Sequence, residues 1–252
     1  MRFPVRMPIG IRPALDRFII GEGAKVPAAY NGMSFSKQPS ENYLRISEAI
    51  KYAAERDGVL PSVPELNVIC VEDDGKSGIV NLNDYHILRT VQFYVPGEKG
   101  FLLGVCNSAN PDVNIILKRP DAAQLAFASG IWRLKPASDA DARRMVEFVR
   151  ETKGLTALPS TRRPYRVALE ALTSDPVSLQ FHEDTAGARA AYLRGRARTL
   201  DAFYLLLDKQ LKEVGSDEIG VWPVGLGNDN YLYSVDADGN IYNIGRSRPM
   251  AR

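Results

Sequence analysis

The side chains best suited to metal binding and nucleophilic chemistry in this sequence are two histidines, His86 and His182, and two cysteines, Cys70 and Cys106. No two of these four residues lie within ten positions of each other. Zinc sites and redox cysteine motifs draw on such residues at short spacing. The sequence therefore predicts no metal site, no cofactor and no catalytic residue of these kinds.

Three short segments share part of a ligand-binding motif. Gly75-Lys76-Ser77 matches the end of a P-loop, but Cys70 stands where that loop needs a glycine, and a strand-like run follows instead of a helix. The acidic segment 236–240 lacks the third ligand and the final glutamate of a calcium loop. Gly225-Leu226-Gly227 lacks the third glycine of a dinucleotide fingerprint. All three segments therefore predict turns or loops.

The run His182-Glu183-Asp184 follows a predicted strand at 177–181. Adjacent carboxylates would raise the pKa of the histidine and suit it to general acid–base chemistry. No nucleophile or second base stands beside it in the sequence, so a surface histidine in a polar turn is the alternative interpretation. The same two interpretations hold for His86, which follows Asp84 and Tyr85.

Basic residues gather in the segment 132–198, which has eleven Arg and two Lys against eight Asp and Glu. Guanidinium groups neutralise phosphates, and an aromatic ring such as that of Tyr192 can stack on a base. If the fold brings the arginines together, they predict a surface for nucleic acid or an acidic partner. The alternative is a solvated helix face. The candidate residues are Arg143, Arg144, Arg162, Arg163, Arg189, Arg194, Arg196 and Arg198.

The hydrophobic pattern predicts the elements that must position these residues. A helix is expected over 40–58, with Ser40 as its N-cap and Gly58 at its end. Alternation and turn residues predict strands at 66–72, 78–82, 87–95, 101–107 and 113–118. Helical periodicity predicts helices at 121–132, 138–154, 186–194 and 199–214, with a Ser138/Asp141 capping box for the second. Further strands are expected at 218–222, 230–235 and 241–244, and 166–172 fits either state.

This order of elements favours an α+β fold over a doubly wound α/β fold. A mostly antiparallel sheet at about residues 66–118 is followed by a helical region and a C-terminal β-hairpin. One division of the chain is an irregular N-terminal segment, helix and sheet over 1–135, then a helix-rich region with the hairpin over 136–252. The alternative is one continuous domain.

The composition is that of a globular protein, with 45% hydrophobic residues and a net charge of +2. No apolar run is long enough for a membrane span, and prolines interrupt the N-terminal residues where a signal peptide would need an apolar core. Two cysteines cannot form a disulfide framework. We therefore expect a cytoplasmic protein with reduced thiols and no membrane partner.

Part of the C-terminal region resembles the SUKH superfamily of bacterial toxin-immunity proteins. The resemblance is carried by Val221-Trp222-Pro223-Val224-Gly225, by the run 230–236 and by Asp238-Gly239-Asn240-Ile241-Tyr242. The early element Pro27-Ala28-Ala29-Tyr30-Asn31-Gly32 is similar to one in that family. The resemblance implies an α+β protein that binds and blocks a toxin in the bacterial cytoplasm.

The sequence thus favours a non-enzymatic protein-binding protein, with toxin neutralisation as its concrete form. A nucleic-acid-binding protein that uses the arginine-rich 143–198 region is one alternative. An enzyme with a dispersed site that leaves no motif is another, because such sites leave no trace in spacing. A self-assembling structural protein is the last, since exposed strands of the C-terminal hairpin can pair between copies.

Overall fold

The computed structural model describes residues 17–20, 26–36, 40, 44–72, 86–108, 132–158, 165–194, 201–204, 211–226, 231–233, 244–245 and 250–251. The helices in these ranges are α1 (Ile46–Ala54), α2 (Val63–Glu72), α4 (Ala140–Thr152), α5 (Pro176–His182) and α6 (Ala186–Arg194). Short 3-10 turns are η1 (Ala28–Tyr30), η3 (Leu169–Ala171) and η4 (Glu183–Thr185). None of the helices in the described ranges has the length and apolar character that crossing a bilayer would require.

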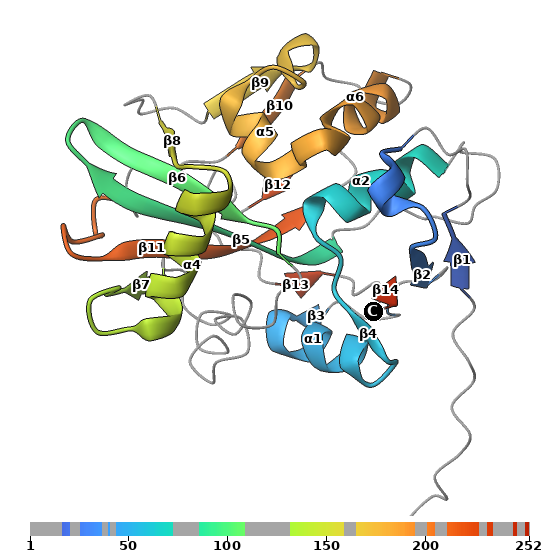
Figure 1. Ribbon diagram of the computed structural model, residues 1–252, viewed down its shortest axis with the longest axis horizontal. Helices are drawn as coiled ribbons and strands as arrows, with labels where there is room; N and C mark the ends of the chain where they lie inside the picture. The colour runs from blue at the N-terminus through green and yellow to red at the C-terminus, as the bar shows by residue number, and fades with distance from the viewer. Residues whose placement is uncertain are drawn as a thin grey trace, which may run out of the picture.

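The larger sheet is built around an antiparallel hairpin of β5 (His86–Gly97) and β6 (Gly100–Cys106). Its strand order is β8-β6-β5-β11-β12-β10-β9, and β7 pairs with β11 beside this path (Figure 1). Only the β10–β12 pair is parallel among these described pairings. The added strands are β7 (Trp132–Leu134), β8 (Thr156–Ala157), β9 (Tyr165–Ala168), β10 (Asp201–Tyr204), β11 (Ile219–Leu226) and β12 (Tyr231–Tyr233).

A second, smaller sheet joins residues from the two ends of the chain. Its order is β1 (Arg17–Ile19), β2 (Ser34–Ser36), β14 (Met250–Ala251) and β4 (Gly58–Val59), so the C-terminal end lies beside β2 in Figure 1. A separate antiparallel pair joins β3 (Leu44–Arg45) to β13 (Ile244–Gly245). The α+β fold class with a mostly antiparallel sheet is confirmed. The larger sheet takes strands from both sides of residue 135.

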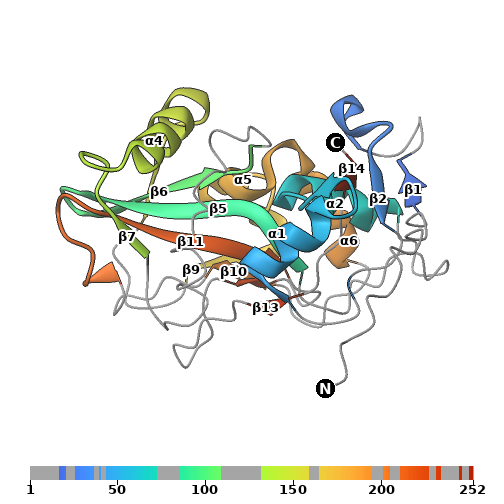
Figure 2. The same ribbon diagram turned by 90° about the horizontal axis from the view of Figure 1, so that it is seen from below.

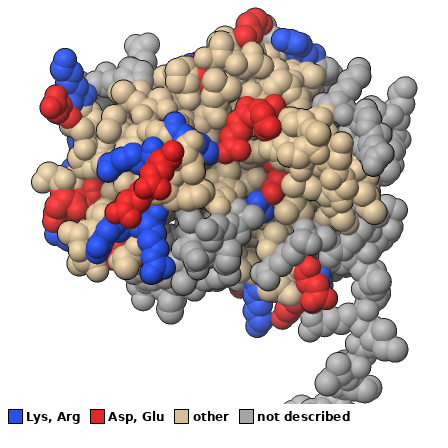
Figure 3. All heavy atoms as spheres, viewed as in Figure 1, with Lys and Arg blue, Asp and Glu red and all other residues tan. Residues whose placement is uncertain are grey.

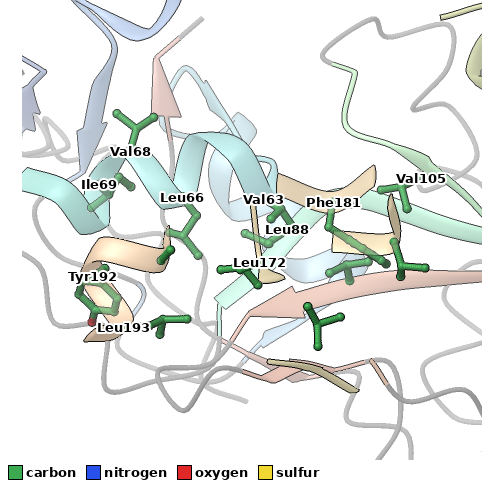
Figure 4. Close-up of a cluster of buried hydrophobic side chains, with 14 of the residues drawn as sticks. Val63, Leu66, Val68, Ile69, Leu88, Val105, Leu172, Phe181, Tyr192 and Leu193 are labelled. Atoms are coloured by element: carbon green, nitrogen blue, oxygen red, sulfur yellow. The ribbon is translucent and has the colours of Figure 1, made fainter. Parts of the chain in front are cut away.

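The side chains of β5 contribute alternately to two hydrophobic clusters, because successive residues of a strand point to opposite faces of the sheet. Ile87, Val91 and Phe93 pack with residues of α1, α4 and β11. Leu88 and Tyr94 belong to the cluster that includes α2, α5 and α6. Figure 4 shows this second cluster, with α2 supplying Val63, Leu66, Val68 and Ile69 and α5 supplying Phe181. Figure 2 shows α4 over one end of the long β5 strand, whereas α2 lies past the other end.

Two predicted strands are helices in the structure. The segment 66–72 lies in α2, which begins with a capping arrangement: Glu65 Oε2 accepts hydrogen bonds from Ser62 N (2.7 Å) and Ser62 Oγ (3.0 Å). The segment 177–181 lies in α5, whose N-cap Asp175 accepts from Ser178 N and is followed by proline at the first helical position. These caps favour helices despite the β-branched content of the segments.

The predicted helix over 199–214 was wrong for residues 201–204, which form β10. This strand pairs with β9 on one side and β12 on the other, so the tertiary pairing overrides the helical pattern. Residues 205–210 lie outside the described residues. The predicted helix at 121–132 also falls outside them except for Trp132, which begins β7.

The helix boundaries differ from those predicted for the other helices as well. Among the described residues of the segment 40–58, Leu44–Arg45 form β3 and Ile46–Ala54 form α1, so Ser40 is too far from the helix to be its N-cap. α1 ends before Asp57 (φ 51°), and Gly58 lies in β4. The helix at 138–154 is confirmed as α4, but its N-cap is Asp139, which accepts from Asp141 N and Ala142 N, and not Ser138. The helix at 186–194 is confirmed as α6.

At the C-terminus, β11 and β12 form an antiparallel pair. The predicted pairing of 230–235 with 241–244 is not the one seen, because β12 pairs with β11 and β10 while β13 pairs with β3. The predicted strands at 78–82 and 113–118, Gly75-Lys76-Ser77 and the acidic segment 236–240 lie outside the described residues.

Candidate functional site

A cleft of about 220 Å³ is lined by residues from the ends of several elements and by Arg89 of β5. Its lining residues come from the start of α2, the end of β6, the end of α4 and the junction of α5 with η4. Its lining combines charged, amide, hydroxyl and aromatic side chains. They are Tyr30, Ser62, Pro64, Glu65, Arg89, Asn107, Ser108, Phe148, Thr152, Lys153 and Glu183.

A buried ion pair between Glu65 and Arg89 forms one wall of the cleft. Arg89 Nη2 lies 2.5 Å from Glu65 Oε1, and each side chain is 8% exposed. Arg89 Nη1 also donates to Leu60 O at 2.8 Å, whereas Arg89 Nε has no hydrogen-bond partner among the described residues. Buried charges are stable only when paired and hydrogen-bonded. The pair therefore fixes the start of α2 against β5.

Asn107 links the two sides of the cleft. Its Oδ1 accepts from Thr90 Oγ1 at 2.7 Å, and Thr90 Oγ1 in turn accepts from Val63 N at 2.9 Å. Its Nδ2 donates to Phe181 O at 3.1 Å and to Glu183 Oε1 at 3.0 Å. A single buried amide thus ties the first turn of α2 to the last turn of α5, where helical carbonyls lack partners within the helix.

Glu183 sits at the end of α5 with φ 49° and ψ −136°, a conformation that favours glycine. Its N–H donates to Leu179 O. Glu183 Oε1 accepts from Asn107 and forms an ion pair with Lys153 Nζ, which also donates to Gln180 O at 3.3 Å. The packed surroundings hold the strained backbone and aim the carboxylate at the cleft lining.

His182 is buried in α5, which corrects the prediction of a surface histidine. Its Nδ1 lies 2.9 Å from Asn67 Nδ2, and Thr185 Oγ1 donates to its carbonyl at 2.5 Å. The predicted rise in pKa was also wrong: burial, and secondly the charge of Arg189, lower the pKa of His182 to about 3. The imidazole is neutral at pH 7 and anchors α5 instead of exchanging protons. His86 is also buried, on β5.

Tyr30, which lines the cleft, donates a hydrogen bond from its OH to Asp184 Oδ1 at 3.0 Å. It joins η1 near the N-terminus to η4. Burial, with the Asp184 acceptor as the second cause, raises the pKa of the Tyr30 phenol above its usual value. Tyr30 therefore stays protonated and acts as a donor.

The candidate arginines do not all reach the surface. Arg143 and Arg144 are exposed on α4, where Arg143 donates to Pro136 O and Ala137 O. Arg194 is exposed at the end of α6. Arg189, also on α6, is buried with its guanidinium 5.4 Å from the centroid of the Tyr192 ring. The remaining four, Arg162, Arg163, Arg196 and Arg198, lie outside the described residues.

The face seen in Figure 3 carries Lys and Arg side chains interleaved with Asp and Glu side chains over α4. Of the arginines on that helix, Arg143 already donates to two main-chain carbonyls. Such mixed charge gives a weaker field for a polyanion than a single-sign surface.

The described part of the chain has no group of three or more His, Cys, Asp or Glu side chains placed to hold a metal ion. The Ser62 hydroxyl donates to a carboxylate already engaged by Arg89, so it is not activated as a nucleophile. Cys106 is buried, and burial raises the pKa of its thiol, which lowers its reactivity. The cleft is equipped for hydrogen bonding and charge pairing.

Sequence reasoning did not single out Glu65, Arg89, Asn107 or Lys153. One signal was present: Ser62 stands three residues before Glu65, the spacing of a capping box. It marks the start of α2 but does not point to the pairing of Glu65 with Arg89.

Comparison with known proteins gives a fold but no family. No family model and no curated protein matches the chain. A solved structure described as "Accommodation of massive sequence variation in Nanoarchaeota by the C-type lectin fold" is similar, with a TM-score of 0.57 and 14% sequence identity. The match covers 85% of this chain and 97% of that chain. The likeness shows a fold similar to the C-type lectin fold.

Proposed function

We propose that this chain is a non-enzymatic binding protein that recognises a protein partner at the cleft. The observation that carries the proposal is the cleft itself, whose polar side chains are held by two sets of hydrogen bonds. One set joins Arg89 to Glu65, and the other joins Asn107 to Thr90 and Glu183. Binding needs such a preorganised set of groups, because groups that are already ordered lose less entropy when a partner docks.

The size of the cleft favours a side chain of a protein over a free cofactor. Small-molecule sites usually enclose about 300–1,000 Å³, and this cleft holds about 220 Å³. That space suits one inserted side chain, with the surrounding surface supplying the rest of the contact. Rim residues such as Thr152 are exposed and available for it.

The fold gives a second, weaker support. The similar solved structure is described as accommodating massive sequence variation on the C-type lectin fold. A scaffold that tolerates varied residues suits recognition of partners, although this argument is one of fold analogy. The resemblance to the SUKH superfamily adds a toxin as the concrete partner of this proposal.

The test is capture of a partner by the full chain from its native lysate, with two matched tryptophan variants. Thr152→Trp fills the cleft, whereas Ala140→Trp adds the same bulk at an exposed position on α4 outside the cleft. We expect a protein in fixed molar ratio, measured by size exclusion with light scattering, that Thr152→Trp loses and Ala140→Trp keeps.

Equal capture by both variants, or no stoichiometric protein, would overturn the proposal. Recovery of nucleic acid that dissociates at high salt would overturn it as well and favour the arginine-rich segment as the binding surface. If a protein is captured in fixed ratio, its mass identifies it and so shows whether it is a toxin.

A further inference from the structure

The charged groups that the described residues contribute to the cleft lining balance each other. Arg89 is paired with Glu65, and Lys153 is paired with Glu183, so two cations meet two anions. The side chains of the first pair are 8% exposed, and those of Lys153 and Glu183 are 20% and 33% exposed. An ion that entered the cleft would have no counter-charge left to compensate it, and burial of an unpaired charge is costly.

Within the described part of the chain, one N–H of Lys153 and one carboxylate oxygen of Glu183 have no hydrogen-bond partner. The Lys153 ammonium has three N–H donors, of which Glu183 Oε1 and Gln180 O take two. Glu183 Oε1 receives Asn107 and Lys153, whereas Glu183 Oε2 receives no hydrogen bond among the described residues. A donor and an acceptor therefore remain side by side at the cleft lining.

We infer that the cleft recognises a neutral carboxamide, the side-chain amide of an asparagine or glutamine in the partner. This inference rests on the proposed function. The amide oxygen accepts from Lys153, and an amide N–H donates to Glu183 Oε2. A carboxamide fills both unused positions without adding net charge, which neither a carboxylate nor an ammonium can do.

The rest of the lining suits the aliphatic stem of such a side chain. Phe148 and Pro64 supply apolar surface beside the polar groups. Asn107 holds Glu183 in place by a 3.0 Å hydrogen bond, and the left-handed backbone of Glu183 fixes where its carboxylate points. Sites that hydrogen-bond a substrate group in this manner reject analogues that lack the group.

Three planar probes of nearly equal size distinguish recognition of a neutral amide, an anion and a cation. They are acetamide, acetate and acetamidinium. Each is titrated into the full ¹⁵N-labelled chain at constant ionic strength, and amide shifts of the cleft residues are followed by NMR. We expect weak but saturable binding of acetamide, at least about fivefold tighter than either ion, that Thr152→Trp abolishes. Preference for an ion, or no saturable shift in the cleft, would overturn the inference.

Two charge variants test the balance argument directly. Glu183→Gln leaves the cleft with one net positive charge, so the preference is expected to move to acetate. Lys153→Met leaves one net negative charge, so the preference is expected to move to acetamidinium. Well-dispersed spectra show that each variant is folded. Unchanged preferences in both would overturn the inference even if acetamide binds the parent chain.

Failure of this inference is distinguishable from failure of the proposed function. A partner captured in fixed ratio and lost in Thr152→Trp, together with probes that prefer an ion, would remove the carboxamide and keep partner binding at the cleft. Capture that ignores Thr152→Trp would remove the proposed function itself.

Discussion

Arg89 on β5 donates to Glu65 in the first turn of α2 across 2.5 Å, and the two side chains are buried to the same extent. The pair crosses from the central hairpin to the helix that walls the cleft. It also completes the cap of α2, because the second oxygen of Glu65 accepts from Ser62. One ion pair thus connects the core sheet, the helix start and the cleft.

Replacing either partner of this pair alone should destabilise the fold strongly, and the two changes together should cost less than the sum of their separate effects. Glu65→Gln and Arg89→Met are each expected to lower the free energy of unfolding by about 3–5 kcal/mol, because each leaves a buried charge without its partner. The double variant should lose less than the sum of the two, by about 1–3 kcal/mol. Urea denaturation gives the free energy of unfolding of the parent chain, the two single variants and the double variant. Simple additivity would contradict the coupling.

A substitution at Gly104 tests the packing of the central hairpin. A Cβ at this position would lie 2.2 Å from Cζ of Phe93, which is fully buried on the paired strand. Gly104→Ala should therefore destabilise the fold by about 1–3 kcal/mol or more. The control is Gly187→Ala in α6, where a Cβ meets nothing within 4 Å and a gain of about 0.5–1 kcal/mol is expected. Thermal denaturation compares them, and equal effects of the two changes would contradict the crowding at Phe93.

The centre of the fold could be predicted from sequence because its signals are local. The strands predicted at 87–95 and 101–107 alternate strongly and flank Pro96 and Gly97, so the sequence predicts the hairpin where it is found. In the structure β5 continues through Pro96 to Gly97, and the turn is formed by Glu98 and Lys99. α4 and α6 were also expected, since the stripe of Met145 and Val149 on α4 is buried as the helical period requires.

The errors arose where a cap or a distant strand decides the outcome. Val68 and Ile69 favour a strand by propensity, but the Ser62–Glu65 cap and packing in the core make the segment helical. Residues 201–204 carry a helical pattern and nevertheless pair with β9 and β12. Neither strand is near them in sequence, so a local pattern carries no sign of the pairing.

The candidate site could not be predicted from the sequence for the same reason. Arg89 is 24 residues from Glu65, and Asn107 is 76 residues from Glu183. Their meeting depends on the order of strands and on which helix ends converge, and no spacing rule encodes that. The sequence pointed to His182-Glu183-Asp184, and of these three residues Glu183, not His182, is among the residues that line the cleft.

Glu183 allows the backbone strain at the cleft to be measured. Glu183→Ala removes the contacts with Asn107 and Lys153 and keeps a side chain in the left-handed region, so it should destabilise the fold. Glu183→Gly removes the same contacts and relieves the strain. The glycine variant should therefore be more stable than the alanine variant by about 1–3 kcal/mol. Urea denaturation gives the difference.

Asp57 provides the matched control for this comparison. It has a similar φ of 51° but lies in an exposed turn after α1, outside the cleft. Asp57→Gly should also be more stable than Asp57→Ala, and neither change should affect binding of acetamide. Glycine and alanine variants of equal stability at position 183 would show that the Glu183 backbone carries no strain.

Protonation of His182 should make the protein less stable in acid. The folded pKa of about 3 lies below the ordinary value of 6.5 because the imidazole is buried and faces the charge of Arg189. Between these values the unfolded chain binds a proton that the folded protein does not, so the free energy of unfolding falls as pH is lowered through 6.5 towards 3. The slope approaches about 1.4 kcal/mol per pH unit.

Urea denaturation from about pH 7 to pH 4 measures this slope. His182→Asn keeps an oxygen acceptor for Asn67 but does not titrate, so its slope should be smaller, and equal slopes would show that His182 is not the group responsible.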